Sequence, residues 1–140
     1  MIVLDTNVLS EAMKRTPDAR VMRWLDRQPH ESVWTTSVTV FEILLGLETM
    51  PEGKRRRGLT DAFARVTDGV LEGRVLDFDA PSARVAATIA ARLRASGRPG
   101  EIRDVEIAGT VARRGATLAT RNVRHFEHTG IRLADPWVDS

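Results

Sequence analysis

The feature that most constrains the fold is the apolar run Ile2–Leu4 at the start of the chain, which stops at Asp5. The run is short, rich in β-branched residues and free of polar alternation, a pattern typical of a parallel strand that is covered on both faces. Such a strand needs helices above and below its sheet. Because parallel sheets bind ligands at the carboxyl ends of their strands, Asp5 lies where a functional side chain is expected.

Later apolar segments predict four further strands, and helical patterns separate them. The predicted strands are Ile2–Leu4, Ser32–Thr36, Arg74–Phe78, Ala116–Thr120 and Ile131–Leu133. The predicted helices run through Leu9 and Met13, over Asp18–Gln28, through the apolar stripe Val40, Ile43, Leu44 and Leu47, through Phe63 and Val66, from Pro81 past Leu93, and over Asp104–Arg114. We interpret Pro51–Gly58 as a turn with a basic run and Ser96–Gly100 as a loop. The order predicts an α/β fold, one domain over residues 1–140 with a central parallel sheet and helices on both faces.

Composition limits the available chemistry. The 140 residues include no cysteine, which excludes disulfides, thiolate metal sites and cysteine nucleophiles. Lys14 and Lys54 are the only lysines among 21 basic residues, so arginine dominates. Arginine suits a phosphate-bearing partner, although codon usage alone also explains such a bias. No leader or membrane segment is recognisable, which predicts a cytoplasmic protein without membrane contact.

Three acids at the edges of predicted elements are the candidate catalytic and metal-binding residues. Asp5 ends the first strand, Glu42 points away from the apolar stripe of its helix, and Asp104 begins the line that Ala108 and Val111 continue. Each acid also has a structural interpretation, which stays open. Asp5 and Asp104 are suitable helix caps or first-turn acids, and Glu42 follows Thr39 in a T-x-x-E capping box.

Convergence of the three carboxylates would require a cation. Each pair about 4 Å apart repels by about 4 kcal/mol at an effective dielectric constant near 20. All-oxygen ligands favour Mg²⁺ or Mn²⁺, which polarises a phosphoryl oxygen and lowers the pKa of bound water. The glycine-rich phosphate loops and the G-x-S-x-G motif are absent from the sequence. The pattern therefore favours metal-dependent phosphodiester hydrolysis.

Four segments in order, MIVLDTNVLSE, SVTVFEILLGL, EIRDVEIAGTVARRGATLATRN and DPW, resemble PIN-domain ribonucleases. The resemblance is to VapC-type toxins of toxin–antitoxin pairs, including the FitB-like branch. It implies that Asp5, Glu42 and Asp104 form the acidic metal site, with Asp5 and Asp104 as direct ligands. It also implies a PIN-like fold, cleavage of single-stranded RNA such as tRNA or rRNA loops, a homodimer, and neutralisation by a cognate antitoxin.

The sequence departs from this family at the fourth acid, which relatives often carry near the late strand. The two positions hold Asn122 and His125 here, and neither supplies negative charge. We interpret the site as needing one metal, with Asn122 orienting water. Thr120, Arg121 and Arg124 are expected to contact the RNA.

Two rival interpretations were weighed. A haloacid-dehalogenase-like phosphotransferase also presents an Asp after its first strand, but it needs a second acid where Asn7 stands and a lysine after a late strand. A non-catalytic PIN-like module that binds RNA or protein is the main alternative, although three clustered acids without a metal are costly to maintain. The basic run Lys54–Arg57 is expected to form a solvated helix face, and Trp34 and Trp137 to pack in the interior.

Overall fold

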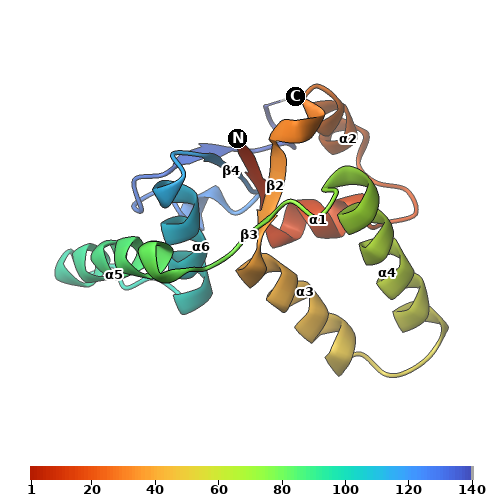
Figure 1. Ribbon diagram of the computed structural model, residues 1–140, viewed down its shortest axis with the longest axis horizontal. Helices are drawn as coiled ribbons and strands as arrows, with labels where there is room; N and C mark the ends of the chain where they lie inside the picture. The colour runs from red at the N-terminus through yellow and green to blue at the C-terminus, as the bar shows by residue number, and fades with distance from the viewer. Residues whose placement is uncertain (140) are drawn as a thin grey trace.

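The computed structural model describes residues 1–139 and contains a five-stranded parallel sheet with the order β3-β2-β1-β4-β5 (Figure 1). The strands are β1 (Ile2–Leu4), β2 (Val33–Thr36), β3 (Val75–Leu76), β4 (Thr117–Ala119) and β5 (Arg132–Ala134). Each of the five predicted strands is confirmed within one or two residues of its observed ends. Strand β1 pairs with β2 on one side and with β4 on the other, so the chain extends the sheet first in one direction from β1 and then in the other. The carboxyl end of β1 lies at this change of direction, where parallel sheets bind ligands.

Six α-helices connect these strands. They are α1 (Thr6–Ala12), α2 (Ala19–Asp26), α3 (Ser37–Thr49), α4 (Lys54–Arg65), α5 (Ala80–Ala95) and α6 (Ile102–Arg113), with one π-helical turn (Val66–Val70) and two 3₁₀ turns (His30–Ser32, Val123–His125). The expectation that Lys54–Arg57 forms a solvated helix face is confirmed, because α4 begins at Lys54 and this run is largely exposed. The turn predicted within Pro51–Gly58 is therefore shorter and ends at Gly53, since lysine and arginine are good helix formers. None of the helices within residues 1–139 is long and apolar enough to cross a membrane.

Helices cover both faces of the sheet, as the continuous apolar run of β1 predicted. Leu4 packs in a core with α1, α2, α3 and α4, whereas its neighbour Val3 packs in a second core with α5 and α6. Successive side chains of a strand point to opposite faces, so one three-residue strand contributes to both cores. Figure 1 shows α5 and α6 on one side of the sheet and the other helices opposite.

The apolar stripe predicted for α3 was only partly right. Ile43 and Leu47 are buried, but 44% of Leu44 is exposed, and so is 54% of Phe41. The buried face instead includes Val38 and Thr39 near the start of the helix. In Figure 1, α3 and α4 extend away from the sheet, so the sheet supports only the beginning of α3.

Close packing of α5 against α6 fixes the position of the candidate site residue at the start of α6. A Cβ atom on Gly109 would lie 2.6 Å from the Cβ of Ala86 and 2.7 Å from its backbone nitrogen. Only glycine therefore allows the two helices to approach this closely. Ala108 and Val111 are fully buried, which confirms that the apolar line of α6 faces inward.

Candidate active site

Asp5 is held at the carboxyl edge of the sheet by two contacts, one with strand β4 and one with helix α1. Its backbone N–H donates to the carbonyl of Ala119 at 2.9 Å, which extends the pairing of β1 with β4 by one residue. Its Oδ1 accepts a hydrogen bond from the N–H of Thr6 at 2.8 Å, so Asp5 caps α1. The side chain is almost completely buried, and this burial raises the pKa of its carboxyl group. The capping interpretation is therefore correct, and it leaves Oδ2 directed elsewhere.

Oδ2 of Asp5 is held by one residue from the loop after β4 and one from the first turn of α1. The Thr120 hydroxyl donates to it at 2.7 Å, and the Asn7 amide lies 3.4 Å away. The same Thr120 oxygen accepts from the backbone N–H of Asn122 at 3.0 Å. Thr120 is completely buried, so its hydroxyl positions Asp5 and Asn122 and does not face the pocket. Thr120 is thus placed to position Asp5 and Asn122, and its predicted contact with RNA stays a prediction.

Glu42 reaches the same region from α3. Its Oε1 accepts a hydrogen bond from the Thr6 hydroxyl at 3.2 Å, and its Oε2 lies 3.7 Å from Nη1 of Arg103. Burial raises the pKa of Glu42, and the negative charges of Asp5 and Asp104 raise it further. This mutual influence indicates that the three carboxylates share one electrostatic environment.

The capping-box interpretation of Glu42 was wrong. Helix α3 begins at Ser37, and its N-cap is Thr36, whose hydroxyl oxygen accepts from the N–H of Thr39 at 3.0 Å. Glu42 therefore lies in the second turn of the helix, beyond the reach of an N-cap amide. Its carboxylate is available to the pocket.

Asp104 lies in the first turn of α6, as one structural interpretation proposed, but Glu101 is the cap. Glu101 Oε2 accepts hydrogen bonds from the N–H groups of Arg103 and Asp104. The carboxylate oxygen Oδ2 of Asp104 lies 3.3 Å from Nδ1 of His125. Burial, then the charge of Glu101, raises the pKa of Asp104, and the charge of Asp5 acts in the same direction. The sequence did not predict this pair of Asp104 with His125, which joins α6 to the turn after β4.

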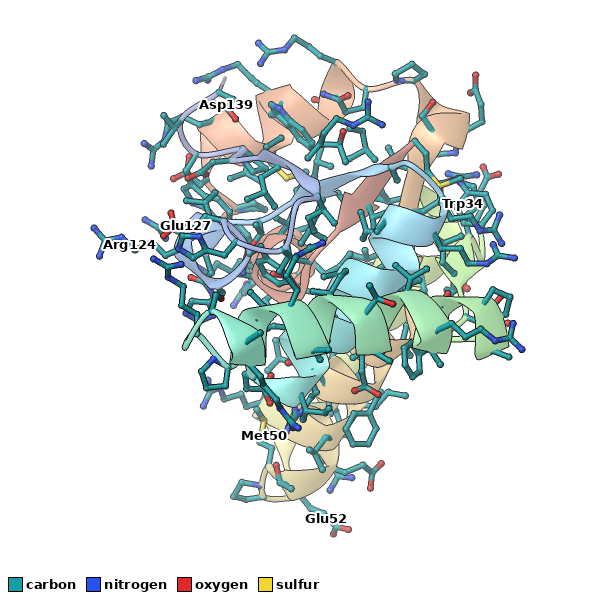
Figure 2. All side chains as sticks on the ribbon, turned by 90° about the vertical axis from the view of Figure 1, so that its left-hand side faces the viewer. Trp34, Met50, Glu52, Arg124, Glu127 and Asp139 are labelled. Atoms are coloured by element: carbon teal, nitrogen blue, oxygen red, sulfur yellow. The ribbon has the colours of Figure 1, made fainter. Side chains whose placement is uncertain are left out.

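The remaining predicted residues follow β4. Asn122 is exposed, and its backbone precedes the 3₁₀ turn that carries Arg124 and His125. Arg124 projects at the rim of the molecule, close to Glu127 (Figure 2). The backbone N–H of Arg121 donates to Asn7 Oδ1 at 2.9 Å, which ties the loop after β4 to the start of α1.

A pocket of about 620 Å³ joins most of these residues. Among its lining residues are Asp5, Thr6, Asn7, Glu42, Asp104, Asn122, Arg124 and His125, together with Arg98 and His128 at the rim. Arg121 lines a neighbouring groove instead. Thr6, Asn7 and Arg98 were missed as site residues, although the D-T-N triplet after a buried strand was a signal for the first two.

The donors in the pocket suit a hard divalent cation, but they are not closed into a cage. Within residues 1–139, no three His, Asp or Glu side chains lie close enough together to enclose a metal ion. Glu42 is turned toward Thr6 and Arg103, and Asp104 is turned toward His125. Burial raises the pKa of all three carboxyl groups, and the charge of Asp5 raises the pKa of Glu42 and Asp104 further, so a positive charge among them would ease their ionisation. A cation with several retained waters fits this arrangement.

Comparison with known families decides the fold family. The family model described as "PIN domain" matches residues 2–131. The chain belongs to the PIN domain family. The prediction of a PIN-like α/β fold with a central parallel sheet is thereby confirmed.

Relatives of this PIN domain match along nearly their whole length. The VapC ribonuclease Y4jK of Sinorhizobium fredii is 39% identical over 137 residues, which cover 98% of each chain. Toxin FitB of Neisseria gonorrhoeae is 34% identical, with 99% of this chain and 100% of the relative covered. The crystal structure of FitAcB from Neisseria gonorrhoeae superposes with a TM-score of 0.86 at 34% identity, covering 99% of both chains. The predicted resemblance to VapC-type toxins and the FitB-like branch is confirmed.

Proposed function

We propose that this PIN domain is a divalent-metal-dependent ribonuclease toxin whose cleavage site is the acidic pocket at the carboxyl end of β1. The observation that carries the proposal is that Asp5, Glu42 and Asp104 line one pocket, where burial raises the pKa of each carboxyl group and the charge of Asp5 raises those of Glu42 and Asp104 further. Relatives named as a ribonuclease and as a toxin, over the full length of the chain, support the reaction class.

Mg²⁺ or Mn²⁺ is the proposed cofactor because the pocket offers carboxylate oxygens and no thiolate. Asp5 and Asp104 would bind it directly, and Glu42 would complete the acidic site. When bound, the ion supplies an activated water and neutralises charge on a phosphate oxygen. One ion is proposed, since the positions of a fourth acid hold Asn122 and His125.

The residues of the chain would orient the reacting groups. The Thr120 hydroxyl and the N–H of Thr6 hold the Asp5 carboxylate in one orientation. The reaction therefore does not pay the entropy of fixing this side chain. Asn122 has its backbone fixed by Thr120 and its side chain exposed, which suits the orientation of a water molecule. Arg124 at the pocket rim and Arg121 in the adjacent groove would hold RNA phosphates on the two sides of the acids.

The proposed substrate is single-stranded RNA, such as a tRNA or rRNA loop. The acids line a pocket in which Asp5 is almost completely buried and Asp104 is partly buried, so a flexible strand reaches them more easily than a rigid duplex. Single strands can also turn their bases toward protein side chains. The family resemblance supports the same substrate class.

We further propose a cytoplasmic homodimer that a cognate antitoxin neutralises. An antitoxin partner is supported by the similarity of this chain to toxin FitB and to a solved member of the VapBC family of toxin-antitoxin systems from Mycobacterium tuberculosis, which is 27% identical with a TM-score of 0.67. An antitoxin arginine entering the pocket would replace the missing positive charge and would compete with metal or RNA.

The proposal is tested by incubating the purified protein with total RNA in Mg²⁺, in Mn²⁺ or in EDTA, followed by mapping of the cut ends. We expect discrete cuts that need metal, that vanish in Asp5→Asn, and that leave no 2′,3′-cyclic phosphate because water is the nucleophile. Arg114→Gln, at the opposite end of α6 from Asp104, is the matched control and should cleave normally. Intact RNA with a folded, metal-binding protein would overturn the proposal in favour of a non-catalytic binding module.

A further inference from the structure

Arg121 is stacked on a tryptophan beside the acidic pocket. Its guanidinium carbon lies 4.8 Å from the centroid of the Trp137 ring, within the range of a cation–π contact. Trp137 itself is only 5% exposed and belongs to the core that α1, α2 and α3 share. The ring is therefore a fixed support, and the guanidinium of the exposed Arg121 lies over it.

The turn that carries Trp137 is braced by its own hydrogen bonds. The backbone N–H of Trp137 donates to Asp135 Oδ1 at 2.9 Å, and the N–H of Asp139 donates to the Asp135 carbonyl at 2.8 Å. Asp139 marks this turn in Figure 2. Since Arg121 is also tied to Asn7 through its backbone, both partners of the stack are anchored independently.

The charge of Arg121 is not used by an ion pair within residues 1–139. Side-chain and backbone hydrogen bonds from Arg20 lower the pKa of Asp18 to about 2, and the charge of Arg121 adds to this effect. Asp18 is therefore already occupied by Arg20. A guanidinium that is stacked, oriented and without a carboxylate partner is suited to an external ligand.

The groove beside the stack is continuous with the acidic pocket. It has a volume of about 480 Å³, and Lys14, Arg121 and Trp137 are among its lining residues. The groove and the pocket share four lining residues: Thr6, Asn7, Glu42 and Asn122. A strand whose phosphate reaches the acids would therefore extend a neighbouring nucleotide into this groove.

We propose that the Arg121–Trp137 stack is a base-binding subsite for a nucleotide adjacent to the scissile phosphate. The base stacks on the open face of the guanidinium, giving a layered base–arginine–tryptophan arrangement. Trp137 acts as a positioning residue, because it holds the guanidinium plane at the correct angle without touching the RNA. This inference rests on the proposed ribonuclease function for the identity of the ligand.

The test separates stacking from charge and does not depend on cleavage. Binding is measured in EDTA by fluorescence anisotropy with two labelled decamers, oligo(A) and an abasic ribose-phosphate chain of the same charge. The wild-type protein should prefer oligo(A) about tenfold, because stacking is lost in the abasic chain. Arg121→Lys should keep the affinity for the abasic chain and lose the preference. Arg114→Lys, the same exchange at the far end of α6, should keep the preference.

Three outcomes would overturn the subsite: no preference in the wild-type protein, a preference that survives Arg121→Lys, or an equal loss of both affinities. Trp137→Leu should behave as Arg121→Lys does, provided that its circular dichroism spectrum and melting temperature show a folded protein. If Trp137→Leu does not fold, Arg121→Lys alone decides. A preference for oligo(A) together with intact RNA in Mg²⁺ would retain the subsite and remove the nuclease, so the two failures are distinguishable.

Discussion

Asp5 and Asp18 perform the same local task in different surroundings. Each caps a helix, Asp5 by accepting from the N–H of Thr6 and Asp18 by accepting from the N–H of Arg20. Burial raises the pKa of Asp5, whereas hydrogen bonds from Arg20 lower the pKa of Asp18 to about 2. The surface carboxylate has its counter-charge beside it, and the buried one shares its pocket with two further acids. Under the proposed function, the counter-charge of Asp5 is the bound divalent ion.

The largest effect should separate the two aspartates in catalysis. Asp5→Asn removes a carboxylate from the proposed metal site and should reduce the rate of RNA cleavage about 100-fold or more. Asp18→Asn removes an equal charge at an equivalent capping position and should leave the rate unchanged. Initial rates on the mapped RNA, at saturating Mg²⁺, provide the measurement. Equal loss in both variants would mean that capping, and not metal binding, explains the role of Asp5.

Metal should stabilise the folded chain through the acidic pocket alone. At about a hundred times its dissociation constant, Mg²⁺ or Mn²⁺ should raise the melting temperature by about 8 °C, because it binds the folded state selectively. Asp18→Asn should show the same shift, and Asp5→Asn and Asp104→Asn should show little or none. A full shift in both pocket variants would place the metal elsewhere.

Replacement of His125 tests the missing fourth acid. His125→Asp brings a carboxylate next to Asp104, and the added negative charge should increase Mn²⁺ affinity about tenfold in a calorimetric titration. His128→Asp makes the same exchange at the pocket rim, where His128 lies beside Glu127, and should have a smaller effect. Asn122→Asp should act in the same direction as His125→Asp. If neither His125→Asp nor Asn122→Asp binds Mn²⁺ more tightly than the wild-type protein, one metal and three acids are sufficient.

The smallest effect should appear in the pH dependence of stability without metal. Asp5 binds its proton more tightly in the folded state, so the stability of wild type relative to Asp5→Asn should fall as pH rises above 3.8, the usual pKa of Asp. The opposite holds for Asp18, whose contribution is present above pH 3.8 and is lost as pH falls toward 2. Urea denaturation in EDTA at several pH values, with both Asn variants, measures the two slopes. Slopes of the same sign would contradict the comparison.

Prediction from sequence succeeded where the signal was local. The run Ile2–Leu4 identified a strand covered on both faces, and the line from Asp104 through Val111 identified the buried side of α6. Prediction failed at α3, where Leu44 belongs to the apolar stripe but is exposed, whereas Ile43 and Leu47 pack in the core that includes Ala62 and Phe63 of α4. Periodicity shows which residues share a face, and the surrounding elements decide which part of that face is buried.

The sequence by itself determined the order of strands and helices, the absence of cysteine chemistry and the three candidate acids. Only the tertiary structure decided how these acids are held. The hydrogen bond from Thr120 to Asp5 spans 115 positions of the chain, and the contact of His125 with Asp104 joins two separate elements. Both depend on the strand order that places β4 beside β1. The raised pKa of Asp5 has the same origin, because burial is a property of the packed structure and not of the residue.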